Sequence, residues 1–99
     1  MPLDLRTVDP RELRLPSSRP GGADPVKLQR QIARFGASTD GMPPLEVYEG
    51  TDGVLVVYNG VTRATRIALL KPGTFVPVDV IGRLRRAYGP ETKIGDFLP

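Results

Sequence analysis

Hydrophobic residues recur at helical spacing in the first half of the chain. Leu28, Ile32 and Phe35 stand at positions i, i+4 and i+7 and share one helix face, while lysine, arginine and glutamine occupy the other faces. Asp24 precedes a proline at the start of this segment, which is the usual order of an N-cap and a first helical residue, and a glycine follows the segment. The pattern predicts an amphipathic helix over residues 25–35.

The pattern then changes to that of β-strands. Residues 45–49 alternate between apolar and polar side chains, and residues 54–58 form a continuous apolar run. A Thr-Asp-Gly sequence at 51–53 supplies the turn between them. We therefore expect a hairpin whose second strand is central in its sheet and covered on both faces.

A second helix and two further strands complete the expected elements. Residues 75–81 read as a strand, with Pro77 at a sheet edge or at the strand's start because proline cannot donate to a ladder. A short strand is expected at residues 5–8. The second helix ends before a Pro-Gly pair and carries an apolar stripe made by Val61, Thr65, Ala68 and Leu69.

This order of elements predicts one small α+β domain over residues 1–82, with a mixed sheet and flanking helices. Residues 83–99 are predicted to form a C-terminal basic turn and tail. Within them, residues 83–88 are expected to make a helical turn with a solvated basic face. The tail offers three apolar residues for docking on the domain: Ile94, Phe97 and Leu98.

Composition excludes several kinds of catalytic and metal-binding chemistry but does not identify a binding partner. The chain has 99 residues, a net charge of +3, no cysteine and no histidine, which excludes disulfides, thiolate catalysis and cysteine- or histidine-bound metals. The modest positive charge permits contact with a nucleotide or DNA without requiring it. No signal-peptide pattern and no long apolar run are present, so we expect a cytoplasmic protein with no membrane partner.

Candidate binding chemistry is concentrated at residues 59–66. An apolar run turns through Asn-Gly into a helical segment, so the backbone N–H groups at the helix start are available to an anion. Arg63 can donate bidentate hydrogen bonds to phosphate, and Thr62 adds a hydroxyl. Arg66 lies one turn further on and reaches either the same ligand or solvent. The predicted phosphate- or nucleotide-binding residues are Gly60, Thr62, Arg63 and Arg66.

The same residues also have a simpler interpretation. An Asn-Gly pair before a helix is ordinary turn and capping chemistry. No catalytic constellation stands out either, since Glu46 and Glu49 lie three residues apart in one strand and therefore on opposite faces. The other carboxylates considered stand beside turns, strand ends or the N-terminal element: Glu12, Asp40, Asp52 and Asp79. Catalytic residues and enzymatic status stay open, and no metal site is predicted.

The order of the short motifs carries a family resemblance. A Pro-Pro-hydrophobic-acid-Val segment at 43–47 precedes a Gly-x-x-Arg turn at 60–63 and a Val-Pro-Val segment at 76–78. This order resembles the ParB/sulfiredoxin superfamily over roughly residues 5–81. The resemblance implies a ParB/sulfiredoxin-like fold, and it places Gly60 and Arg63 where the family has its glycine and its phosphate-binding arginine.

Departures from the family pattern limit the implied activity. ParB proteins have Gly-Glu-Arg-Arg at this turn, whereas this chain has Val61 and Thr62 after the glycine. Sulfiredoxins have their catalytic cysteine at the position of Val61, so sulfinic-acid reduction is excluded. Related free-serine kinases and nuclease-like members have Asp-Gly-His-His-Arg, and here Asn59 replaces the acid and no histidine follows.

Two main functions remain open at this stage. The resemblance implies a ParB-like nucleotide/phosphate- or nucleic-acid-binding domain, with weak nuclease or NTPase activity and a nucleoside triphosphate with Mg as the expected ligand. The alternative is a catalytically degenerate protein-interaction module, such as an antitoxin, immunity or accessory factor, with a protein partner. A free amino-acid kinase is a third reading, which the missing histidines disfavour.

Overall fold

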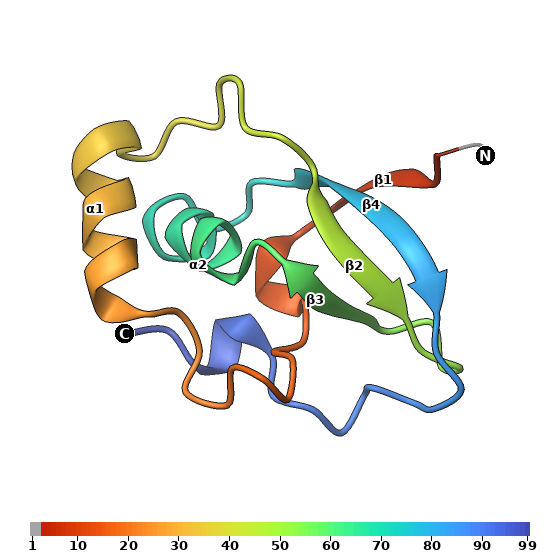
Figure 1. Cartoon of the computed structure of the whole chain (residues 1–99). Helices are drawn as coiled ribbons and strands as arrows, with labels where there is room; N and C mark the ends of the chain where they lie inside the picture. Colours follow the sequence, from red (N-terminus) through yellow and green to blue (C-terminus); the bar gives the residue numbers. More distant parts are fainter. Residues whose placement is uncertain (1–2) are drawn as a thin grey trace.

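A four-stranded mixed sheet organises the molecule (Figure 1). The structure is a computed structural model and describes residues 3–99. Strand β4 lies antiparallel to β1 and parallel to β2, while β2 and β3 form an antiparallel hairpin. The predicted α+β class with a mixed sheet is confirmed. The strand order is β1 (Leu5–Val8), β4 (Val76–Arg83), β2 (Leu45–Glu49), β3 (Leu55–Asn59).

Two α-helices pack beside the sheet, and α2 lies between α1 and the strands (Figure 1). Helix α1 (Pro25–Phe35) has the predicted bounds because Asp24 caps it, accepting hydrogen bonds from the N–H groups of Val26 at 2.8 Å and Lys27 at 3.2 Å. Helix α2 (Val61–Leu70) follows β3 directly. Two 3-10 turns, η1 (Pro10–Glu12) and η2 (Ile94–Asp96), come from opposite ends of the chain.

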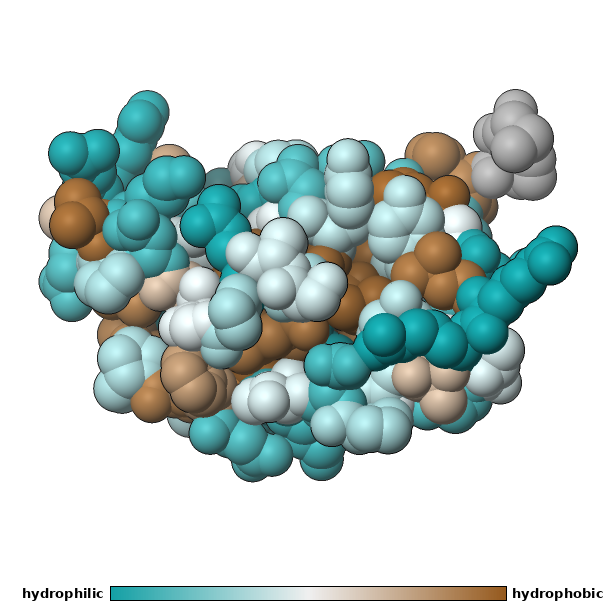
Figure 2. Space-filling model, turned by 60° about the horizontal axis from the view of Figure 1, so that its bottom comes forward, coloured by the Kyte–Doolittle hydropathy of each residue, from teal (hydrophilic) through white to brown (hydrophobic). Residues whose placement is uncertain are grey.

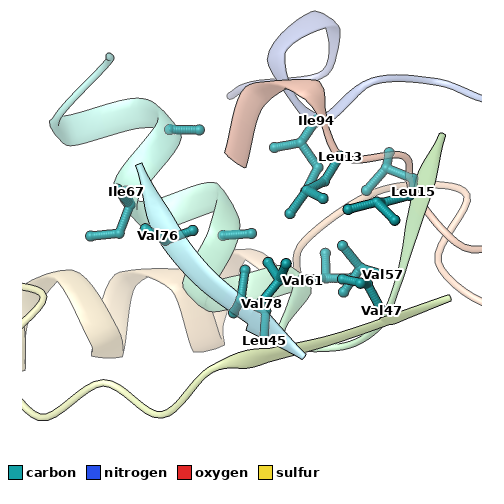
Figure 3. Close-up of a cluster of buried hydrophobic side chains, with 13 residues drawn as sticks. Leu13, Leu15, Leu45, Val47, Val57, Val61, Ile67, Val76, Val78 and Ile94 are labelled. Carbon is teal, nitrogen blue, oxygen red and sulfur yellow. The ribbon is translucent and has the colours of Figure 1, made fainter. Parts of the chain in front are cut away.

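The core lies between the inner face of the sheet and the buried side of α2 (Figure 3). Val61 and Ile67 of α2 meet side chains that β2, β3 and β4 direct inward. Leu13, Leu15 and Ile94 cover the remaining side of this cluster. The sheet contributes Leu45, Val47, Leu55, Val57, Val76 and Val78.

The position of β3 corrects one expectation. It lies at the edge of the sheet, whereas the apolar run predicted a central strand. Leu55, Val56 and Val57 are buried, whereas Tyr58 at the end of the run is 63% exposed. The backbone of Arg14 pairs with the free edge of β3, donating from its N–H to the carbonyl oxygen of Leu55 at 2.9 Å and accepting from the N–H of Val57 at 3.1 Å. Pro77 is the second residue of β4, which is an interior strand, so the alternative of a strand start is the correct one.

The C-terminal segment differs from the predicted helical turn. Arg83 ends β4, and residues 84–88 form bends and irregular backbone. The carboxylate of Asp52 holds this segment extended by accepting from the N–H groups of Tyr88 and Gly89. Docking of the tail is confirmed for Ile94, which is 1% exposed, whereas Phe97 is 47% exposed. Within residues 3–99, no helix is long and apolar enough to cross a membrane.

Candidate functional site

A cavity of about 470 Å3 opens where α2 begins, and we call it the α2 cavity. Its walls come from the loop before α1, from α1 itself, from the end of β3 and from the first turn of α2. Three of the four predicted site residues line it together: Gly60, Thr62 and Arg63. Arg66 lines a different, smaller cavity.

The start of α2 faces the α2 cavity without a cap. The first intrahelical hydrogen bond runs from the N–H of Ala64 to the carbonyl oxygen of Gly60 at 2.9 Å. Gly60 is the N-cap residue and has no side chain that could cap the earlier N–H groups. Within the described chain, the N–H groups of Val61, Thr62 and Arg63 have no hydrogen-bond partner. Helix α1 begins at the same cavity but is capped by Asp24. The open end of α2 is therefore the one that can accept an anion.

Gly60 is required at this turn by conformation and by space. Its φ of 119° lies in the region that L side chains rarely adopt. A Cβ built on it would lie 2.6 Å from Cδ2 of Leu45 and 3.0 Å from Nη2 of Arg63. The guanidinium of Arg63 thus passes directly over the glycine, and a larger residue would displace it.

Arg63 is the partly buried cation of the cavity. Its Nη1 donates to the carbonyl oxygen of Pro43 at 3.0 Å, and it has no ion pair among residues 3–99. Burial lowers the pKa of its guanidinium, while the nearby carboxylate of Glu46 acts in the opposite direction. Glu46 itself accepts from Nδ2 of Asn59 at 3.1 Å. Arg63 therefore keeps its charge and retains donors that a ligand can use.

Two further cations at the cavity were missed by reasoning from the sequence. Arg19 comes from the loop before α1 and Lys27 from the first turn of α1. The signal for Lys27 was available, since α1 has three basic residues and no acidic one on its polar face. Asp24 is the one carboxylate in the cavity lining, and its capping bonds to Lys27 and Val26 lower its pKa.

Arg66 lies away from the α2 cavity. The alternative in which the side chain reaches solvent is wrong, because Arg66 is 2% exposed. Its Nη1 donates to the carbonyl oxygens of Gly36 at 2.7 Å and Ser38 at 2.8 Å, in the loop after α1. Its guanidinium also lies 5.4 Å from the ring centre of Phe35. Burial lowers its pKa. Arg66 therefore anchors the loop formed by residues 36–42 to α2.

A second cavity of about 100 Å3, which we call the loop cavity, lies between this loop, α1 and α2. Gln31 and Arg63 line both cavities, so the two adjoin. Among the residues that the structure describes, no group of three or more acidic, cysteine or histidine side chains could hold a metal ion. The arrangement is suited to binding an anion at a helix start rather than to holding a metal by protein ligands.

Comparison of the chain with protein-family models, with curated proteins and with solved structures gives no match. The class that the fold defines is a small α+β domain with a mixed four-stranded sheet and two helices.

Proposed function

We propose that the α2 cavity binds the phosphate group of a nucleotide or a nucleic acid. One observation carries the proposal: the uncapped N–H groups of α2 and the guanidinium of Arg63, which has no ion pair within residues 3–99, line the same cavity. A helix start contributes about 0.3–1 kcal/mol to anion binding. A charge-assisted hydrogen bond contributes about 1.5–3 kcal/mol more.

The distribution of charge supports an anionic ligand. The salt bridges found in residues 3–99 all involve β1, η1, the end of β4 or the C-terminal segment. None of them includes Arg19, Lys27 or Arg63, which surround the α2 cavity. The lining has one carboxylate, that of Asp24, against these three cations, so the cavity presents a net positive charge to a ligand.

The family resemblance supports the same site. Gly60 and Arg63 occupy the glycine and arginine positions of the ParB/sulfiredoxin pattern, and the ParB-like fold is part of this proposal. A nucleoside triphosphate with Mg is the first ligand to test, and DNA is the second. Hydrolysis of either ligand is measured in the same experiment. Weak activity at most is expected, because Asn59, Val61 and Thr62 stand where catalytic members of that superfamily have reactive side chains.

A titration tests the proposal. Nucleoside triphosphates with Mg2+, and separately a short single-stranded DNA, are added to the wild type, to Arg63→Ala and to Arg30→Ala. Arg30 is an exposed cation on α1 outside the cavity lining and serves as the matched control. We expect Arg63→Ala to weaken binding by about 10- to 100-fold and Arg30→Ala to change it little. Equal affinities for all three proteins, or no binding at all, would refute the phosphate site.

The protein-interaction alternative rests on a different surface. An apolar cavity of about 310 Å3 lies between α1, α2 and the C-terminal segment, with Leu28, Phe97 and Leu98 in its lining. The C-terminal segment and the loop before α1 lie at the bottom of Figure 1, and hydrophobic surface crosses the centre of the face that Figure 2 brings forward. An apolar segment of a partner protein fits such a surface.

A photo-crosslinking side chain at position 97 tests this alternative, with position 75 as its control. Phe75 is exposed and lies outside this cavity. Irradiation is carried out in cells that produce the protein. One defined adduct with another protein, formed from position 97 and not from position 75, supports an interaction module. Identical adducts from both positions, or none, contradict it.

A further inference from the structure

A cavity of about 220 Å3, which we call the tyrosine cavity, lies on the face of the sheet opposite the core. Tyr48 points to this face because it alternates along β2 with the core residue Val47. Tyr58 of β3 meets Tyr48 edge to face, with ring centres 5.5 Å apart and ring planes at 81°. Tyr88, from the segment after β4, is the third ring in the lining. Both α-helices of the described chain lie on the other side of the sheet, so these rings stay open to a ligand (Figure 1).

The lining of the tyrosine cavity has no charged side chain. Arg86 lies just outside it, with its guanidinium 4.4 Å from the ring centre of Tyr88 and an ion pair to Glu91. Glu46, on the same face of β2, is also outside the lining and accepts a hydrogen bond from Asn59. Besides the three rings, the lining consists of apolar and small residues: Pro16, Ser17, Ser18, Val56, Val57 and Leu84. Such a cavity suits a flat uncharged ring rather than an anion.

The tyrosine cavity adjoins the α2 cavity on one side. Ser18 and Tyr58 line both cavities. The α2 cavity has the three cations described above, which form no ion pair within residues 3–99. A ligand with several phosphates and several rings can therefore extend from those cations directly onto the tyrosines.

A third cavity adjoins the tyrosine cavity on another side, and we call it the hairpin cavity. It measures about 610 Å3, lies at the turn between β2 and β3, and shares Leu84 with the tyrosine cavity. Arg83 and Arg85 line it together with one carboxylate, that of Glu49, which pairs with Arg83 and Arg6. Arg85 is exposed and has no ion pair within residues 3–99. The basic cluster that follows β4 thus adds a second cationic region beside the rings.

Uncharged rings between two cationic regions match one class of ligand. A single-stranded nucleic acid alternates phosphates with bases whose faces are free, and proteins bind it with a cationic groove and aromatic side chains. We propose that a single-stranded nucleic acid extends from the α2 cavity across the tyrosine cavity to Arg85, a proposal that rests on the phosphate-binding function argued above. Its phosphates contact the cations at both ends, and its bases stack on the tyrosines between them.

Fluorescence anisotropy of a labelled ten-nucleotide strand, made as DNA and as RNA, tests this path. The same sequence in a duplex and a nucleoside triphosphate with Mg2+ are the comparison ligands. We expect the wild type to bind at least one of the two single strands about fivefold or more tightly than the duplex, because paired and stacked bases cannot stack on the tyrosines. Tyr48→Leu and Tyr88→Leu alter residues that line the tyrosine cavity and not the α2 cavity. Each should weaken single-strand binding by about 5- to 30-fold and leave the nucleoside triphosphate affinity unchanged within about twofold.

Phe75→Leu is the matched control, since Phe75 is 62% exposed and lies outside all three cavities. It should bind the single strand as the wild type does. Tyr88→Phe keeps the ring and should also retain binding within about twofold. Arg85→Gln should reduce the slope of log affinity against log salt concentration by about 0.7, the value for one lost phosphate contact on a single strand. The urea midpoint of each variant confirms that it is folded during the titration.

The outcomes separate this proposal from the phosphate site. Equal single-strand affinities of the wild type, Tyr48→Leu and Tyr88→Leu would overturn the path across the tyrosines, and the phosphate site would still stand if Arg63→Ala weakens binding. Equal affinities of the wild type for the single strands and the duplex would also overturn the path, because charge alone would then explain binding. Weaker binding by the tyrosine variants with no effect of Arg63→Ala on any ligand would refute the phosphate site and with it the path from the α2 cavity.

Discussion

The carbonyl oxygen of Pro43 accepts a 3.0 Å hydrogen bond from Nη1 of Arg63, twenty residues further along the chain. Pro43 lies near the end of the loop that follows α1, and Arg66 holds the earlier part of that loop at Gly36 and Ser38. Two arginines one turn apart on α2 thus contact the same loop. One of them retains donors toward the α2 cavity, so the orientation of the cation depends on the loop.

Replacing Arg63 by lysine separates charge from geometry. Lysine keeps the positive charge but has one ammonium group, which cannot contact Pro43 and present a fork to phosphate together. We expect phosphate-ligand affinity to fall by about tenfold while the midpoint of urea unfolding changes little. Arg30→Lys is the control, and an unchanged affinity for Arg63→Lys would show that the fork is not used.

Gly60→Ala should destabilise the fold strongly. The added Cβ meets Leu45 at 2.6 Å in a backbone conformation that alanine rarely adopts, so we expect a loss of about 2–4 kcal/mol in the free energy of unfolding. Gly73→Ala isolates the backbone part, because Gly73 also has a positive φ, of 87°, but open space around it. A loss of about 1 kcal/mol is expected there, measured by urea titration. Equal losses for the two variants would contradict the role of the close contact.

Arg66→Met should loosen the loop after α1. Two carbonyl oxygens lose their donor, although removing a buried charge without a carboxylate partner offsets part of the effect. We expect a net loss of about 1–3 kcal/mol in unfolding free energy and faster amide hydrogen exchange across residues 36–42. Arg34→Met, at an exposed position on α1, should leave that exchange unchanged. Unchanged exchange in Arg66→Met would show that other contacts hold the loop.

Ile94→Ala should unfold the domain more easily than its place near the end of the chain suggests. Ile94 is fully enclosed with Leu13 and Leu15, so a cavity remains after truncation and a loss of about 2–4 kcal/mol is expected. Phe97→Ala removes a larger side chain that is half exposed and should cost less. Thermal and urea unfolding of the two variants measure the difference, and the reverse ranking would contradict the packing.

Acid should weaken the attachment of the C-terminal segment through Asp52. Burial raises the pKa of this carboxyl, but hydrogen bonds from the N–H groups of Gly89, Tyr88 and Val54 together outweigh it and lower the pKa below its ordinary value. The folded state therefore binds fewer protons than the unfolded state. The contribution of the Asp52 carboxylate to the free energy of unfolding is present above about pH 4 and is lost as the pH falls through the lowered pKa.

The pH effect can be isolated with Asp52→Asn. The difference in unfolding free energy between wild type and variant should be larger at pH 7 than at pH 3, measured by urea titration at both values. Asp40→Asn is a control at an exposed loop position. A difference that stays constant with pH would show that the carboxylate charge does not stabilise the segment.

Local patterns predicted most of the elements. Helix α1 matches its expected bounds because an N-cap, a proline and an apolar stripe all indicate the same segment. The edge position of β3 could not be predicted, because an apolar run reports burial and not which neighbour provides it. Here the backbone of Arg14, about forty residues earlier, pairs with the free edge of the strand. The irregular backbone after Arg83 was also missed, since it depends on the distant carboxylate of Asp52.

The candidate site was predicted only where it is local. Gly60, Thr62 and Arg63 follow one another at the strand–helix turn, so sequence spacing alone brings them together. Arg19, Lys27 and Gln31 reach the same cavity through the packing of α1 against α2, which spacing does not encode. Arg66 shows the same limit, because its burial depends on where the loop after α1 returns.

The segment around Arg14 lies between β3 and the C-terminal segment, bridging Val56 on one side and Lys93 on the other. During synthesis on the ribosome, residues 13–15 therefore emerge about eighty residues before their second neighbour. Until residues 92–94 leave the ribosome, Leu13 and Leu15 lack part of their cover, and the nascent chain presents them to chaperones or to other chains. The core of this domain is therefore complete only after residues 92–94 have been made.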